Sequence, residues 1–343
     1  MFWKHEVPQS EWVGDQAMYD DLPDLGQGKA TLGWVNVSEG IQDARWNYLR
    51  QLMEHENPYT GLRYADDPAL AVIEVQNEDN IFGTILNTIH QGQAPLHLQR
   101  FRRGFAGWVR SHYADNDELM AAWGTGLENN DAYDAEELET YSAWQMHANE
   151  PFFGQSGDRV FYVPEKRKRM GDYTRFVAEL QRAVFLRRKT RLQEVGFAGI
   201  VMSTAWRPGG ESDHAAVIYA DSALDAIDRH GYWGGIAYDR EETPRSDYQV
   251  SEAPFRDNSL MDLSTWYVDG RQVGLLGRGF EQVENRPFSM TEWAHRTPNR
   301  WRAEATPIYA LYGMGLQGWD QSYHFANGRG TDVLTHWTGP YSA

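Results

Sequence analysis

The stretch Leu70-Ala-Val-Ile-Glu-Val-Gln-Asn-Glu-Asp-Asn80 changes character within a few residues. Its first half is a short apolar run rich in valine and isoleucine, which is typical of a buried parallel strand. Its second half begins with Asn77 and Glu78, an amide followed by a carboxyl group. The pattern therefore predicts a strand over 71–76 whose C-terminal end presents Asn77 and Glu78 for chemistry.

Four further segments have strand character, and helical patterns separate them. The strand candidates are 198–204, 226–230, 288–292 and 316–325. Helical spacing is strongest over 38–54, 101–113, 117–123, 172–195 and after the Thr306-Pro307 pair. Strands separated by helices imply a parallel sheet with helical crossovers. Functional groups at the C-terminal ends of such strands are typical of a (β/α)₈ barrel.

The expected fold is therefore of the α/β class, a TIM (β/α)₈-type barrel that forms a single catalytic domain over 1–343. Five strand candidates fall short of the eight that a barrel needs. We therefore expect the barrel to be incomplete at its N-terminus. The largely helical region at about 95–170 would be an insertion after the strand that ends at Glu78. A chain lacking strands could also associate with itself to complete the barrel.

The composition excludes several classes of function. The formal net charge is −17, which disfavours nucleic acid and an anionic membrane surface as partners. The chain has no cysteine, so it has neither disulfides nor thiolate chemistry. No His-Glu-x-x-His metal motif or phosphate-binding glycine loop occurs, and we expect no metal and no cofactor. No signal peptide is recognisable, which leaves open a cytoplasmic protein or a fragment of a secreted one.

A second carboxylate stands in a similar setting in Phe288-Ser-Met-Thr-Glu-Trp293. Two carboxyl groups about 5–5.5 Å apart can hydrolyse a glycosidic bond with retention, one as acid/base and the other as nucleophile. We assign Glu78 as the acid/base and Glu292 as the nucleophile. The simpler alternatives are a surface glutamate at 78 and, at 292, a glutamate paired with an arginine such as Arg296.

Five other residues are candidates for binding the substrate. Asn77 is placed to bond the sugar 2-hydroxyl, a contact that strengthens in the transition state. His230, which ends the strand candidate at 226–230, and Tyr232, just after it, would contact the sugar or orient the nucleophile. Trp319 would stack beneath the sugar or pack in the core. Trp206, after the second strand candidate, would line a neighbouring subsite or serve packing alone.

These motifs resemble those of the clan A glycoside hydrolases, the retaining (β/α)₈-barrel superfamily that includes cellulases, mannanases, β-galactosidases and agarases. In that superfamily Asn-Glu ends the fourth strand and the nucleophile ends the seventh, as Asn77-Glu78 and Glu292 would here. The segment 57–78 looks like one found in large bacterial cellulase-like members. Asp228-Arg-His-Gly-Tyr232 is similar to the sixth strand, and Gly315-Leu-Gln-Gly-Trp-Asp320 to the eighth.

The resemblance covers about residues 40–325 and implies three strands upstream, one of which supplies an arginine that cannot be assigned here. It implies a retaining β-glycoside hydrolase that cleaves a polysaccharide or oligosaccharide by double displacement. The alternative is a catalytically inactive carbohydrate-binding protein on an incomplete barrel.

Overall fold

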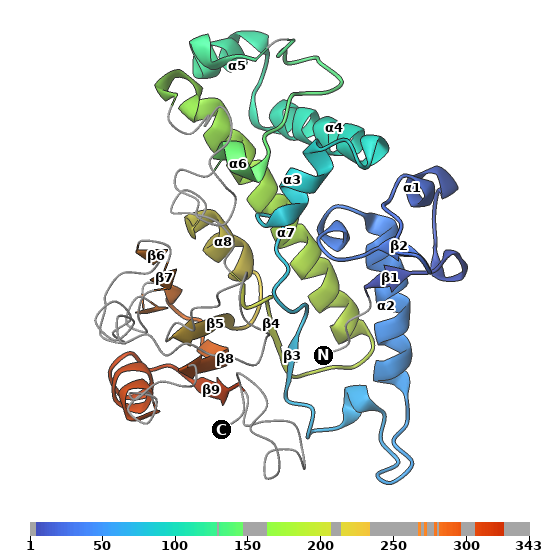
Figure 1. Ribbon diagram of the computed structural model, residues 1–343, viewed down its shortest axis with the longest axis vertical. Coiled ribbons are helices and arrows are strands. Elements are labelled where there is room, and N and C mark those ends of the chain that lie inside the picture. The colour runs from blue at the N-terminus through green and yellow to red at the C-terminus, as the bar shows by residue number, and fades with distance from the viewer. Residues whose placement is uncertain are drawn as a thin grey trace, which may run out of the picture. The chain divides into compact units, whose positions relative to one another are not determined.

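The computed structural model describes residues 5–128, 130–146, 163–206, 214–233, 267–268, 271–272, 278–279, 281–295 and 306–325. The chain divides into two compact units, Met1–Leu224 and Asp225–Ala343. The first unit is mainly helical and the second contains a parallel sheet (Figure 1). The proposal that all 343 residues form one domain stays a prediction.

The first unit begins with a small antiparallel pair, β1 (Glu6–Val7) with β2 (Lys29–Ala30). Its α-helices are α1 (Gln16–Asp20), α2 (Glu39–Glu54), α3 (Thr84–His90), α4 (Pro95–His112), α5 (Asn116–Trp123), α6 (Ala143–Met146), α7 (Arg167–Glu194) and α8 (His214–Asp221). Short 3-10 turns lie at η1 (Gln9–Glu11), η2 (Trp34–Asn36), η3 (Tyr64–Asp66), η4 (Gly124–Gly126) and η6 (Pro164–Lys166). The helices predicted at 38–54, 101–113, 117–123 and 172–195 are confirmed, with shifted ends.

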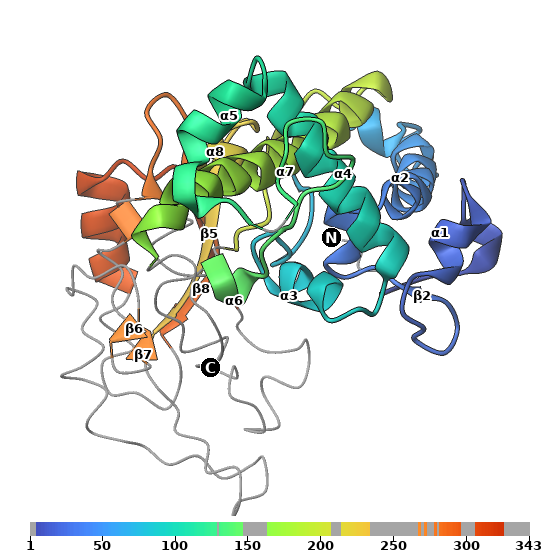
Figure 2. The same ribbon diagram turned by 90° about the horizontal axis from the view of Figure 1, so that it is seen from above.

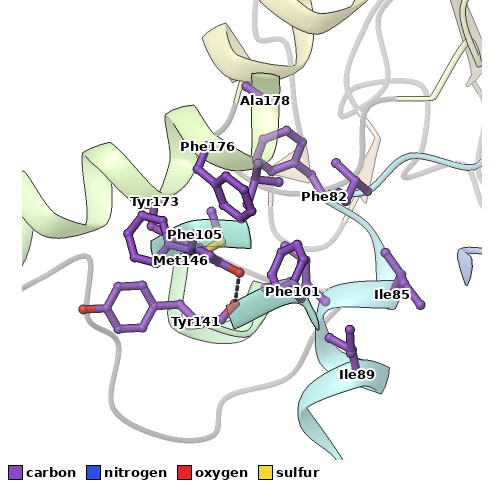
Figure 3. Close-up of a cluster of buried hydrophobic side chains, with 14 of the residues drawn as sticks. Phe82, Ile85, Ile89, Phe101, Phe105, Tyr141, Met146, Tyr173, Phe176 and Ala178 are labelled. Carbon is purple, nitrogen blue, oxygen red and sulfur yellow. Dashed lines mark hydrogen bonds between the residues drawn. The ribbon is translucent and has the colours of Figure 1, made fainter. Parts of the chain in front are cut away.

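The long helix α7 organises the core of this unit, and α4 packs beside it (Figure 2). Aromatic rings fill the interface: Phe105 lies 5.3 Å from Tyr173 and 5.4 Å from Phe176, measured between ring centroids. The hydroxyl of Tyr173 donates to the carbonyl of Tyr141 at 2.8 Å, so the buried ring is also anchored at its polar end (Figure 3). This aromatic packing holds α4 against α7, and within the described part of 95–170 the helices alternate with a loop over 127–128 and 130–142.

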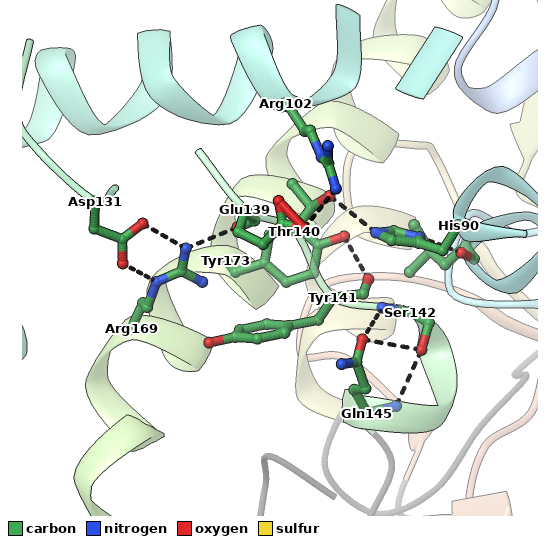
Figure 4. Close-up of polar contacts among 11 residues, drawn as sticks. His90, Arg102, Asp131, Glu139, Thr140, Tyr141, Ser142, Gln145, Arg169 and Tyr173 are labelled. Atoms are coloured by element: carbon green, nitrogen blue, oxygen red, sulfur yellow. Dashed lines mark hydrogen bonds and ion pairs between the residues drawn. The ribbon is translucent and has the colours of Figure 1, made fainter. Parts of the chain in front are cut away.

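A buried ion pair connects α7 to the loops that precede α6. Arg169 is fully buried and donates to both carboxylate oxygens of Asp131, at 2.6 and 2.8 Å, and to the carbonyl of Glu139 at 2.8 Å (Figure 4). Its guanidinium also lies 5.1 Å from the ring centre of Trp123. A desolvated cation needs such bidentate pairing, since an unpaired one would be very costly.

The first unit also holds two strands. β3 (Val72–Glu74) and β4 (Ile200–Met202) pair in parallel, with Ile73 opposite Val201. The segment between them contains α3 to α7, which makes this a parallel crossover of the kind the sequence predicts. Because the strands run in the same direction, the residues that follow each of them emerge at one edge.

The second unit has a three-stranded parallel sheet in the order β5 (Ile227–Trp233), β8 (Phe288–His295), β9 (Gln321–His324), which lie side by side in Figure 1. A π-helical segment, η8 (Tyr309–Leu316), connects β8 to β9. β6 (Tyr267–Val268) and β7 (Arg271–Gln272) form a separate antiparallel pair. The core beneath the sheet is built from Ile227, Phe288, Met290, Trp293, Tyr309 and Trp319.

All five predicted strands are present and parallel, but the predicted TIM (β/α)₈-type barrel is wrong. The described residues form sheets of two and three strands and no closed barrel. A barrel requires every strand to have a neighbour on both sides. Within the described residues β3 pairs with β4 alone, and β5 and β9 are the ends of their sheet. Local sequence patterns identified the strands correctly, but they do not determine which strand edges pair with a further strand.

In the part of the chain that the structure describes, no helix has the length and apolar character needed to span a bilayer.

The buried pair of Arg169 and Asp131 provides a test of the helical core. Asp131→Ala leaves the arginine charge buried without its carboxylate, and we expect the free energy of unfolding to fall by about 3–5 kcal/mol. Glu139→Ala is the matched control, because it removes only the exposed ion pair with Arg102 and should cost less than about 1 kcal/mol. Urea denaturation measures both values, and equal losses would contradict this account.

Candidate active site

Glu78 occupies an unusual backbone conformation just past the end of β3. Its φ is +44°, in the left-handed region that residues other than glycine rarely adopt. The backbone N–H of Glu78 donates to the carbonyl of Thr204, just past β4, at 2.8 Å. The side chain is exposed. Such strained conformations persist only where the surrounding structure enforces them, and they are common at functional sites.

The loop after Glu78 is held on both sides, which explains how the strain is maintained. Asp79 is buried and accepts from the backbone N–H of Gly33 at 2.8 Å and from Asn36 at 3.0 Å. The backbone N–H of Ile81 donates at 2.8 Å to the side chain of Gln181 on α7. Burial raises the pKa of Asp79, although its hydrogen bond from Gly33 and the charge of Arg45 oppose the shift. The residues flanking Glu78 are therefore fixed, while Glu78 itself reaches solvent.

Two of the predicted binding residues lie in the same unit as Glu78. The Oδ1 atom of Asn77 is buried and has no hydrogen-bond partner among the described residues. The ring of Trp206 packs on Gly83 so closely that a Cβ atom there would lie 2.6 Å from it. The structure therefore places Asn77, Glu78 and Trp206 around the ends of β3 and β4.

In the second unit, a bulge in β8 sets the direction of Glu292. Met290 pairs with Arg229 on β5, but Glu292, two residues on, pairs with His230, so β8 contains one extra residue. The pairing with β9 shifts in the same region. Met290 and Trp293 are both buried in the core although they are three residues apart, which plain alternation would not allow. The bulge thus turns Glu292 away from the core that its neighbours fill.

His230 and Glu292 face each other across β5 and β8. The Nδ1 atom of His230 lies 3.5 Å from a carboxylate oxygen of Glu292. His230 is 7% exposed, and the Glu292 side chain is 20% exposed. A histidine at this distance can orient the carboxylate. The orienting role of His230 stays a prediction.

The remaining predicted residues are placed differently. Trp319 is 2% exposed and packs against Phe288 and Tyr309, at centroid distances of 5.1 and 5.3 Å. Its ring has no open face for a sugar, and core packing, the other role considered for it, is what the structure shows. The backbone of Tyr232 belongs to β5, but its side chain lies outside the described residues, as does Arg296.

Sequence reasoning missed Asp79, Thr204 and the bulge at Thr291. Asp79 directly follows Glu78, and its burial reflects partners more than forty positions upstream, Gly33 and Asn36. Thr204 ends a segment predicted as a strand, which was a usable signal. The bulge has no local signature, since it arises from pairing with β5 and β9.

Each unit thus contributes one half of the predicted chemistry. The first unit holds an exposed carboxyl group beside an amide acceptor and an indole ring. The second holds a carboxylate with a histidine against it. The meeting of Glu78 with Glu292 stays a prediction.

Comparison with known proteins gives a likeness of fold alone. No family model matches the chain, and no curated protein does. A solved structure of an exo-beta-agarase is similar, with a TM-score of 0.50 and 12% sequence identity. The match covers 91% of this chain and 35% of the agarase chain, so this protein spans about a third of that length.

Because Glu78 has a left-handed conformation, we expect glycine to be more stabilising than alanine at this position, the reverse of the order within a helix. Glycine tolerates a positive φ and alanine does not, so Glu78→Gly should be more stable than Glu78→Ala by about 1 kcal/mol. At Gln51, an exposed position within α2, alanine should instead be better than glycine by about 1 kcal/mol. Urea denaturation of the four variants tests this, and an alanine preference at both positions would contradict it.

Proposed function

We propose that this protein is a retaining β-glycoside hydrolase that cleaves a polysaccharide or oligosaccharide. Glu78 acts as the acid/base and Glu292 as the nucleophile. One observation carries the proposal: each glutamate is placed by a parallel strand, Glu78 just past the end of β3 and Glu292 within β8, and each lies at a backbone irregularity. A left-handed residue and a β-bulge each redirect a side chain and interrupt the regular structure of a strand. Both features are frequent near active sites.

In the first step, a carboxylate oxygen of Glu292 attacks the anomeric carbon while Glu78 gives its proton to the departing glycosidic oxygen. In the second step, Glu78 takes a proton from water, and the oxygen of that water replaces Glu292 at the anomeric carbon. Two substitutions at the same carbon retain its configuration. The reaction needs a rigid pair of carboxyl groups and no cofactor.

The neighbouring residues have roles that follow from their contacts. His230, 3.5 Å from Glu292, holds the nucleophile in orientation. The buried Oδ1 of Asn77 accepts a hydrogen bond from the sugar 2-hydroxyl, which supplies the partner it otherwise lacks among the described residues. Trp206, fixed against Gly83, offers a ring for stacking at a neighbouring subsite. Tyr232 is proposed as a further sugar contact from the sequence alone.

The likeness to an exo-beta-agarase supports a polysaccharide or oligosaccharide as the substrate class. It is a likeness of fold, so the choice of reaction rests on the residues. The net charge of −17 favours a neutral or weakly charged polymer.

The roles of the two glutamates are separable by varying the leaving group of an aryl β-glycoside. Glu292→Gln removes the nucleophile and should lower kcat by about 10³-fold or more for every leaving group. Glu78→Gln removes the proton donor, so the loss should be about 10²–10⁴-fold for a poor leaving group and much smaller for dinitrophenolate, which needs no protonation. Both variants should still bind sugar.

Glu284→Gln serves as the control, because Glu284 is an exposed glutamate in the same unit as Glu292. NMR of the first product anomer tests retention in the wild-type protein. Full activity in purified Glu292→Gln would overturn the assignment. Binding of sugars by the wild-type protein without any turnover would instead favour the inactive carbohydrate-binding protein.

A further inference from the structure

A cavity of about 300 Å³ lies in the first unit, between α2, β3 and α7, and does not involve Glu78. One wall is apolar and includes Trp46, Leu49 and Leu52 of α2. A second wall is formed by β3 and the two residues that follow it, Val75 and Gln76. Cavities of this size lined by apolar groups with a few placed polar groups are typical of small-molecule sites.

The charged groups of this cavity are mainly cationic. Its lining contains three arginines, Arg45, Arg188 and Arg191, together with one acidic residue, Glu74. Arg191 is paired with Asp43 at 2.6 Å. Arg45 donates to the side chain of Gln76 at 3.2 Å. Even with Glu74 ionised, the lining has an excess of positive charge.

Arg188 is the most poorly satisfied of the three. Its Nη1 atom makes a long hydrogen bond of 3.4 Å to the carbonyl of Val75. No carboxylate of the described residues lies within ion-pair distance of it. Asp79 attracts its charge, but that carboxylate is already engaged by Gly33 and Asn36. A guanidinium with five donors is thus left largely uncompensated at the wall of a cavity.

The electrostatic surroundings agree with this geometry. Burial, followed by the like charge of Arg45, lowers the pKa of Arg188 to about 9, and Asp79 only partly opposes the shift. An anion beside Arg188 would relieve this strain, because an opposite charge at close range favours the charged form.

We propose that this cavity binds a small organic monocarboxylate, with its carboxylate paired to Arg188 and its apolar body against Trp46 and Ile73. A guanidinium receives a carboxylate through two parallel hydrogen bonds, which suits the planar fork of Arg188. Inorganic anions would be poor ligands, because they would leave the apolar walls of the cavity in contact with water. This site is independent of the proposed glycosidase chemistry.

The test is isothermal titration of the full chain with phenylacetate and with phenylacetamide, a neutral analogue of nearly the same shape. We expect phenylacetate to bind saturably at one site and phenylacetamide to bind at least about tenfold more weakly. Arg188→Met should weaken phenylacetate binding by about ten- to a hundredfold. Arg175→Met, which removes an exposed arginine of the same helix, should leave it unchanged.

Thermal unfolding separates a ligand site from a structural role. If Arg188 serves binding, Arg188→Met removes a partly buried charge that no carboxylate of the described residues pairs, and its Tm without ligand should equal or exceed that of the wild type. A lower Tm would indicate that the arginine holds the fold. Arg188→Lys keeps the positive charge but lacks the planar guanidinium. Its affinity for phenylacetate should lie between those of the wild type and Arg188→Met.

Three results would overturn the proposal. The first is equal binding of phenylacetate and phenylacetamide to the wild type, and the second is unchanged phenylacetate binding in Arg188→Met. The third is no binding of either probe. The comparison of the two probes needs no variant, so it stands even if a substituted chain fails to fold.

Discussion

The hydrogen bond from the backbone N–H of Glu78 to the carbonyl of Thr204 is the contact on which the candidate site depends. It extends the parallel pairing of β3 and β4 beyond the last paired residues, and it does so with Glu78 in a left-handed conformation. A strand that continued regularly would send this residue to one face of the sheet. The anchored loop that follows, with Asp79 and Ile81 as its fixed points, stabilises the departure. The carboxyl group of Glu78 is therefore presented to solvent from a rigid frame.

In the second unit, a different backbone irregularity, a β-bulge, sets the direction of a glutamate side chain. Glu292 belongs to a strand whose neighbours, Met290 and Trp293, fill the core. One extra residue in β8 resolves the conflict between an apolar strand and a functional carboxylate. The same shift sets Glu292 opposite His230, so a single irregularity both frees the carboxylate and provides its partner. In both units, a local departure from ideal geometry sets the direction of a candidate glutamate, and regular structure supports it.

Charge burial separates the structural arginines from the one we assign to a ligand. Arg169 is bidentate to Asp131 and stands among aromatic rings, so its charge is paired within the helical core. Arg229 is likewise buried against Glu281. Arg188 has no such partner among the described residues and faces a cavity instead of a packed interior. The contrast follows from one rule, since a buried cation is stable in proportion to the hydrogen bonds and counter-charges around it.

The sequence by itself determined much of the secondary structure around the candidate site. Val-Ile runs that end in polar groups identified β3 and β4, and helical periodicity identified α2, α4 and α7, because both signals are local. Asn77, Glu78 and Glu292 were recognisable for the same reason. Only the tertiary structure decided that the strands form separate sheets and no closed barrel in the described residues, that Trp319 is a core residue, and that Glu292 lies on a bulge beside His230. These properties depend on which distant segments pair and how closely they pack, and a chain's local pattern carries no record of either.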